Sequence, residues 1–157
     1  MSTWNEKIEK NVGADLQDGE TLLMGLLLHP PRAMGRSMAR GIGGVGGAAA
    51  QVAMRQSAQE PDVDPDIGFA ATLPPGTMVV GITDQRFLVW GWTQLTGKPK
   101  ALLCELPITE LEAVETTAQK ASTAVVLRFA DESGTAREAP KIGNNIDGFV
   151  SAWETTR

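Results

Sequence analysis

The chain has 157 residues, of which 42% are hydrophobic and 21% charged, and this composition fits one globular domain with a substantial core. Its net charge of −5 disfavours a nucleic-acid-binding protein, and its single cysteine excludes an internal disulfide. Its first residues are polar and charged, so we expect no signal peptide, and no stretch reaches the roughly 20 consecutive apolar residues that span a bilayer. We therefore expect one cytoplasmic domain over residues 1–157.

The N-terminal part predicts a helix followed by a strand. Apolar residues recur every fourth position between charges, so residues 1–16 are predicted to form an amphipathic helix. Those apolar residues are Trp4, Ile8 and Val12. Residues 21–28 form a continuous apolar run that ends before two prolines. The run predicts a buried strand, although its length also allows a short helix.

Residues 31–66 are predicted to be an insertion, because their composition shifts to Gly, Ala, Met and Arg and then to an acidic, proline-containing stretch. Arg32, Arg36 and Arg40 would share one face of a helix. The five glycines between residues 41 and 47 oppose that helix by roughly 5 kcal/mol. Three interpretations stay open: a basic element for an anionic membrane surface or headgroup, a Gly-rich loop, and a small-residue contact between subunits.

The remainder of the chain predicts a mainly β structure that ends in a helix. The expected strands are residues 77–83, 86–92, 101–106, 111–117, 123–130 and 135–139. The fourth of these runs, 111–117, is ambiguous between strand and helix. An exposed loop at 96–100 carries the candidate ligand residues Lys98 and Lys100. The final helix, residues 145–155, begins at Asn145 as N-cap and carries one apolar stripe.

The strand at residues 86–92 is apolar on both faces. One face can line the core, whereas the face with Leu88, Trp90 and Trp92 needs a separate cover. The N-terminal helix, the insertion or a second subunit could supply it. Because monomers rarely expose an apolar patch of this size, we predict a homo-oligomer with these residues at its interface.

Several motifs, in this order along the chain, resemble bacterial pleckstrin-homology-like (PH-like) and GRAM-related domains. They are Asp18-Gly19-Glu20 before an apolar strand, the hairpin at 80–89 with Thr83-Asp84-Gln85-Arg86 at its turn, Gly97-Lys98-Pro99, and Phe129-Ala130-Asp131 before a glycine turn. The match covers residues 18–28 and 78–153. The resemblance implies an α+β, mainly β fold: a seven-stranded barrel or sandwich capped by a C-terminal helix. The N-terminal helix and the Gly-rich insertion are additions to that pattern.

No catalytic constellation is recognisable in the sequence. Gly41, Gly43 and Gly46 match a dinucleotide fingerprint, but no strand precedes them as that motif requires. His29 is the only histidine and Cys104 the only cysteine, so a zinc site or a Cys–His pair lacks parts. We expect no metal, no cofactor and no enzymatic activity.

The functional expectation is a non-catalytic binding or interaction module that self-associates and whose ligand the sequence does not assign. A protein partner and an anionic membrane surface are the candidate partners. In the membrane alternative the protein would be peripheral to the inner face of the membrane, with the arginine row of the insertion as its contact. Nucleic acid is not an expected partner.

Overall fold

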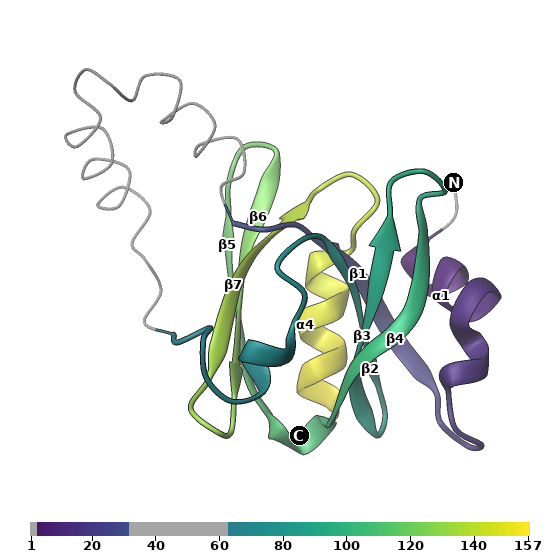
Figure 1. Ribbon diagram of the computed structural model, residues 1–157, viewed down its shortest axis with the longest axis horizontal. Helices are drawn as coiled ribbons and strands as arrows, with labels where there is room; N and C mark the ends of the chain where they lie inside the picture. The colour runs from purple at the N-terminus through teal and green to yellow at the C-terminus, as the bar shows by residue number, and fades with distance from the viewer. Residues whose placement is uncertain (1–2, 32–62) are drawn as a thin grey trace.

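The computed structural model describes residues 3–31 and 63–157, which form seven strands, two α-helices and three 3₁₀ turns (Figure 1). The helices are α1 (Trp4–Val12) and α4 (Ile146–Thr155), and the 3₁₀ turns are η1 (Gly13–Asp15), η2 (Phe69–Thr72) and η3 (Ile108–Glu110). The strands are β1 (Leu22–Leu28), β2 (Met78–Thr83), β3 (Arg86–Thr93), β4 (Lys98–Pro107), β5 (Leu111–Ala118), β6 (Ser122–Phe129) and β7 (Gly134–Pro140).

The described strands pair in antiparallel fashion as two sheets, with the orders β1-β2-β3-β4 and β5-β6-β7. The prediction of a closed barrel is therefore wrong, and the sandwich alternative describes the molecule. On one side of the sandwich β4 and β5 do not pair, and η3 lies between them in the chain. On the other side, β1 meets β7 at a single described bridge, between His29 and Glu138.

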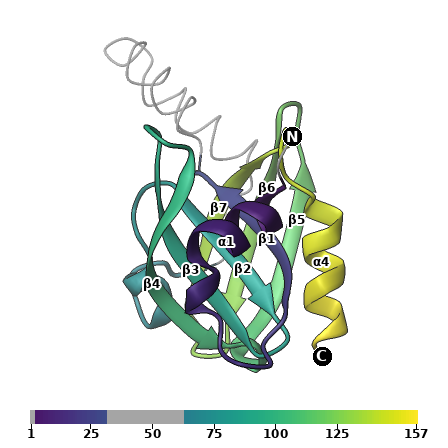
Figure 2. The same ribbon diagram turned by 90° about the vertical axis from the view of Figure 1, so that its right-hand side faces the viewer.

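The core lies between the two sheets and continues under α4. Alternate residues of β6 point inward, and Val125, Leu127 and Phe129 are almost fully buried, as the period of two in a strand requires. Phe149 of α4 is fully buried in the same cluster. Figure 2 shows α4 along the side of the sandwich next to β5, so this helix closes one of the open sides.

Helix α1 covers the outer face of the first sheet. Its buried residues Trp4, Ile8 and Val12 pack in one cluster with Leu88 and Trp90. This overturns the assignment of Leu88 and Trp90 to a subunit interface: both are 0% exposed because the chain's own N-terminal helix covers them. The third predicted interface residue, Trp92, is partly buried at the margin of this cluster.

Two facing glycines allow α1 to approach the sheet. Gly25 of β1 pairs with Gly81 of β2 in the antiparallel register. A Cβ at Gly25 would overlap Cδ1 of Ile8, and a Cβ at Gly81 would come within 2.9 Å of the Trp90 ring. The absence of side chains at this pair therefore creates the space that Ile8 and Trp90 fill.

The free edge of β1 is closed by asparagine side chains. Asn5 of α1 donates to the carbonyl of Leu23 at 3.1 Å and accepts from the N–H of Gly25 at 2.7 Å. Asn144, in the loop before α4, makes the same pair of bonds with the N–H and carbonyl of Leu27, at 3.0 and 3.1 Å. Each amide takes the place of a neighbouring strand's backbone, so an edge that could recruit another chain is occupied.

Most of the predicted elements are confirmed. The two ambiguous runs are strands β1 and β5, and Asn145 caps α4 by accepting from the N–H of Gly148 at 2.9 Å. The prediction was wrong for the loop at 96–100, because β4 begins at Lys98, which pairs with Thr93 of β3. The Gly-rich part of the insertion, residues 32–62, lies outside the described residues.

Replacing Gly25 with Ala is expected to lower the free energy of unfolding by about 1–3 kcal/mol, because the new methyl group forces Ile8 out of its position. Chemical denaturation of the variant measures this loss. Ile8→Val removes the overlapping Cδ1 atom and should restore part of the stability in the double variant.

Gly91→Ala is the matched control, since it also lies in a strand but a Cβ there would meet only side-chain atoms at 3.6 and 3.7 Å. It should be nearly neutral. Equal losses at Gly25 and Gly91 would contradict the close approach of α1 as the cause.

Candidate functional site

Two of the four motifs that carry the resemblance meet in a buried ion pair, between Glu20 and Arg86. The Glu20 carboxylate accepts from Arg86 twice, from Nε at 2.9 Å and from Nη2 at 2.6 Å. It also accepts from the hydroxyl of Thr83 at 2.6 Å and the N–H of Gln17 at 2.8 Å. The Glu20 side chain is 0% exposed and that of Arg86 is 11% exposed. The carboxylate is thus fully surrounded by donors, which is what a buried charge requires.

The same arginine links its own strand β3 to η1, to β4 and to the turn that carries Glu20. It donates to the carbonyl of Asp15 in η1 at 2.9 Å and to the half-exposed carboxylate of Glu105 in β4 at 3.0 Å. Next to it, Asp84 accepts from the N–H of Thr21 at 3.0 Å, which holds the β2–β3 turn against the start of β1. The Asp-Gly-Glu and Thr-Asp-Gln-Arg motifs therefore form a structural joint.

The ion pair sets the protonation state of Glu20. Hydrogen bonds from Arg86 are the main cause that lowers the pKa of Glu20 from 4.5 to about 2, against an opposing effect of burial. Arg86 in turn has its pKa raised, chiefly by the hydrogen bonds to Glu20. Both groups are consequently charged at neutral pH.

The two residues considered for catalysis have structural partners. His29 shares a 2.8 Å hydrogen bond between Nδ1 and the Thr77 hydroxyl, and its ring meets Trp92 edge-on at 6.3 Å. Burial lowers the pKa of His29. The Cys104 thiol donates to the carbonyl of Thr72 at 3.1 Å. The Nε1 atom of Trp92 is buried without a hydrogen-bond partner, and nothing in the described part of the chain explains this.

Arg137 is a buried cation whose described partners are all neutral. It donates to the Thr135 hydroxyl at 3.0 Å and to the carbonyls of Gly76 and Pro74 at 2.9 and 2.8 Å. Burial lowers its pKa. The two bonds to Gly76 and Pro74 attach β7 to the loop that precedes β2, so Arg137 has a structural role.

One end of the molecule gathers exposed lysines and apolar side chains. The β3–β4 turn, the β5–β6 turn and the β7–α4 loop all lie at the upper end in Figures 1 and 2, and the N–H of Lys141 bonds to the carbonyl of Ala121. We call this surface the basic end and define it by its exposed residues: Leu95, Lys98, Lys100, Lys120, Lys141 and Ile142.

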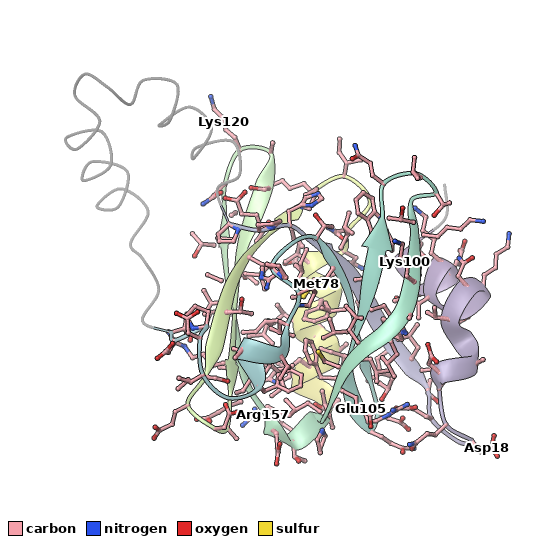
Figure 3. All side chains as sticks on the ribbon, in the orientation of Figure 1. Asp18, Met78, Lys100, Glu105, Lys120 and Arg157 are labelled. Carbon is pink, nitrogen blue, oxygen red and sulfur yellow. The ribbon has the colours of Figure 1, made fainter. Side chains whose placement is uncertain are left out.

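The lysines of the basic end have no ion-pair partner among the described residues. Leu95 and Ile142 are the most exposed large apolar side chains described, at 96% and 84%. Figure 3 shows Lys120 at this end and Asp18, Glu105 and Arg157 at the other. The turns at the far end also carry carboxylates, at Asp84, Glu110, Asp131 and Glu132 (Figure 1).

A cleft of about 310 Å³ lies between the starts of the two helices. It is lined by Thr3, Trp4 and Asn5 at the start of α1, by Met24 and Gly25 of β1, and by residues 143–145 before α4. Because Asn5 and Asn144 are used to hold the edge of β1, the walls of the cleft are fixed by the fold.

The sequence identified part of this surface. Lys98 and Lys100 were predicted as ligand residues and lie at the basic end, whereas Arg32, Arg36 and Arg40 are outside the described residues. Lys120, Lys141 and the cleft were missed. Lys120 and Lys141 are isolated in the sequence and come together only because β5, β6 and β7 pair, so no local pattern signals them.

No protein-family model matches the chain, and no curated protein matches it in sequence. No described helix is long and apolar enough to cross a membrane. The described residues contain no cluster of three or more His, Cys, Asp or Glu side chains that could hold a metal ion.

Replacing Glu20 with Gln should lower the free energy of unfolding by about 3–5 kcal/mol at pH 7, because it leaves Arg86 buried without its counter-charge. The wild type should also become less stable as the pH falls from about 4.5 towards 2. Glu20 has a depressed pKa in the folded state, so its contribution is complete above its unfolded value and is lost on protonation, by on the order of 3 kcal/mol. Urea denaturation at several pH values measures both effects.

Glu105→Gln is the control, because Glu105 pairs with the same arginine but lies at the surface. Since the Glu105 side chain is 55% exposed, its loss should cost less than about 1 kcal/mol. The Glu20→Gln variant should show a flatter pH profile than the wild type between pH 4.5 and 2. An unchanged profile would mean that other carboxylates cause the acid sensitivity.

Proposed function

We propose that the chain is a non-catalytic, PH-like interaction module that docks on an anionic membrane surface through its basic end. The observation that carries the proposal is the coincidence, at one end, of lysines without a described ion-pair partner and the two most exposed large apolar side chains among the described residues. Lysines supply attraction to anionic headgroups, and apolar side chains at turn tips can enter the interface. Leu95 and Ile142 occupy such positions.

The net charge of −5 is compatible with this orientation. Interactions between exposed charges are largely screened beyond a Debye length of about 10 Å at 0.1 M salt. The labelled carboxylates Asp18 and Glu105 lie at the end opposite Lys120 (Figure 3). Repulsion of these carboxylates by an anionic membrane would therefore favour the orientation in which the basic end faces it.

The PH-like assignment is supported by the order of elements: a four-stranded and a three-stranded antiparallel meander followed by a C-terminal helix. Binding is favoured over catalysis because the motif residues Glu20, Thr83 and Arg86 bond to one another in a structural joint. Self-association stays a prediction, now without the apolar face at Leu88 and Trp90 that suggested it. A cytoplasmic location fits because the cytoplasmic leaflet is the anionic one.

Vesicle co-sedimentation tests the docking surface. The protein should bind vesicles that contain phosphatidylserine at low salt, and binding should weaken as salt is added. Replacing Lys98 and Lys120 with Gln should weaken binding about thirtyfold, because each lysine near an anionic surface contributes about 1 kcal/mol.

The matched control replaces Lys10 and Arg157 with Gln, which changes the net charge equally at positions away from the basic end. It should leave vesicle binding nearly unchanged. Equal losses in both double variants would show that only net charge matters, and no binding by the wild type at low salt would reject the proposal.

A further inference from the structure

The cleft between α1 and α4 lies where the N-termini of two helices converge. Thr3 is the N-cap of α1 and Asn145 is the N-cap of α4, and both line the cleft. Each cap satisfies one backbone N–H, at Glu6 and at Gly148. The first turn of an α-helix leaves further N–H groups without an intrahelical acceptor, and these groups carry the positive end of the helix dipole.

An unpaired side-chain donor faces the same space. Trp4 is only 7% exposed, and its Nε1–H donates to no described residue. Nε1 lies 3.9 Å from the point where a Cβ on Gly143 would stand, so it faces the loop wall of the cleft. By contrast, the indole N–H groups of Trp90 and Trp153 are hydrogen-bonded, to Asp15 and to the carbonyl of Leu111.

The chemistry of the walls selects an acceptor-rich ligand. The side-chain carbonyl oxygens of Asn5 and Asn144 accept from the backbone of β1, so neither amide offers the cleft a free acceptor. The Lys7 ammonium lies 4.4 Å from the centroid of the Trp4 ring and adds positive charge. Glu6 and Asp147 stand in the first helical turns and oppose it, but neither lines the cleft.

We propose that the cleft between the starts of α1 and α4 is a binding site for a compact phosphate group, with the Nε1–H of Trp4 as one of its donors. Small-molecule pockets measure about 300–1,000 Å³, so this cleft is at the small end of the range and suits a single charged group. The group could be free inorganic phosphate or the phosphomonoester of a lipid headgroup. Either form offers oxygens to the two helix N-termini, as helix-bound phosphates do.

Indole resonances in a ¹H–¹⁵N NMR spectrum report on the site directly. Titration with inorganic phosphate at constant ionic strength should shift the Trp4 Nε1–H signal in a saturable way. The signals of Trp90 and Trp153 should stay in place, because their N–H groups are already bonded within the protein. Absence of a saturable Trp4 shift would overturn the proposal.

Two variants distinguish a loss of phosphate binding from a general loss of stability. Trp4→Phe keeps a packed ring but removes the donor, and calorimetry should show phosphate affinity about tenfold weaker or more. Gly143→Asn places a side chain in the cleft at a residue with φ of 86°, a conformation that Asn tolerates, and should abolish binding. Gly19→Asn is the control, with φ of 80° and open space around the new side chain. Unchanged affinity in Gly143→Asn would contradict the site.

Vesicles distinguish the two sources of phosphate. If the ligand is a headgroup, vesicles with phosphatidic acid should bind more tightly than phosphatidylserine vesicles of matched surface charge, and Gly143→Asn should lose that preference. If the ligand is free phosphate, both vesicles should bind alike and the variant should lose only phosphate binding. The headgroup form rests on the proposed membrane docking. The phosphate titration does not, so the two proposals fail separately.

Discussion

Glu20 and Arg86 bring two charges into a region from which water is almost excluded, and this pair constrains the first half of the structure. A buried charge without its partner costs several kcal/mol, so the chain must keep the two side chains in contact. Arg86 opens β3 and Glu20 precedes β1, while the remaining donors of Arg86 reach η1 and β4. The register of the first sheet and the end of α1 are therefore set together.

The position of α1 follows from that joint and from two further contacts. Asp15, whose carbonyl accepts from Arg86, also accepts from the indole N–H of Trp90 at 3.0 Å. At the other end of the helix, Asn5 bonds to the backbone of β1. Helix α1 is held near both ends in this way, and its start forms one wall of the cleft beside the basic end. The structural joint and the candidate binding surface thus occupy opposite ends of the molecule.

Local patterns predicted the secondary structure well because burial imposes a period on each element. The fourfold spacing of Trp4, Ile8 and Val12 and the N-cap at Asn145 are such patterns, and the structure confirms both. Three features depend on how distant segments pack, and no local spacing of residues predicts them. They are whether the sheets close into a barrel, which element covers Leu88 and Trp90, and the cleft. The Glu20–Arg86 contact joins residues far apart in the chain, and the sequence showed it only as two separate motifs of the family resemblance.

We propose that the basic end, and not the opposite end with the Glu20–Arg86 joint, faces the ligand surface. Paramagnetic broadening of backbone amide signals by a spin-labelled lipid in phosphatidylserine nanodiscs measures this orientation directly. We expect the strongest broadening in the β3–β4 turn, the β5–β6 turn and the β7–α4 loop. Stronger broadening in the β2–β3 and β6–β7 turns, or uniform broadening over the whole chain, would contradict it.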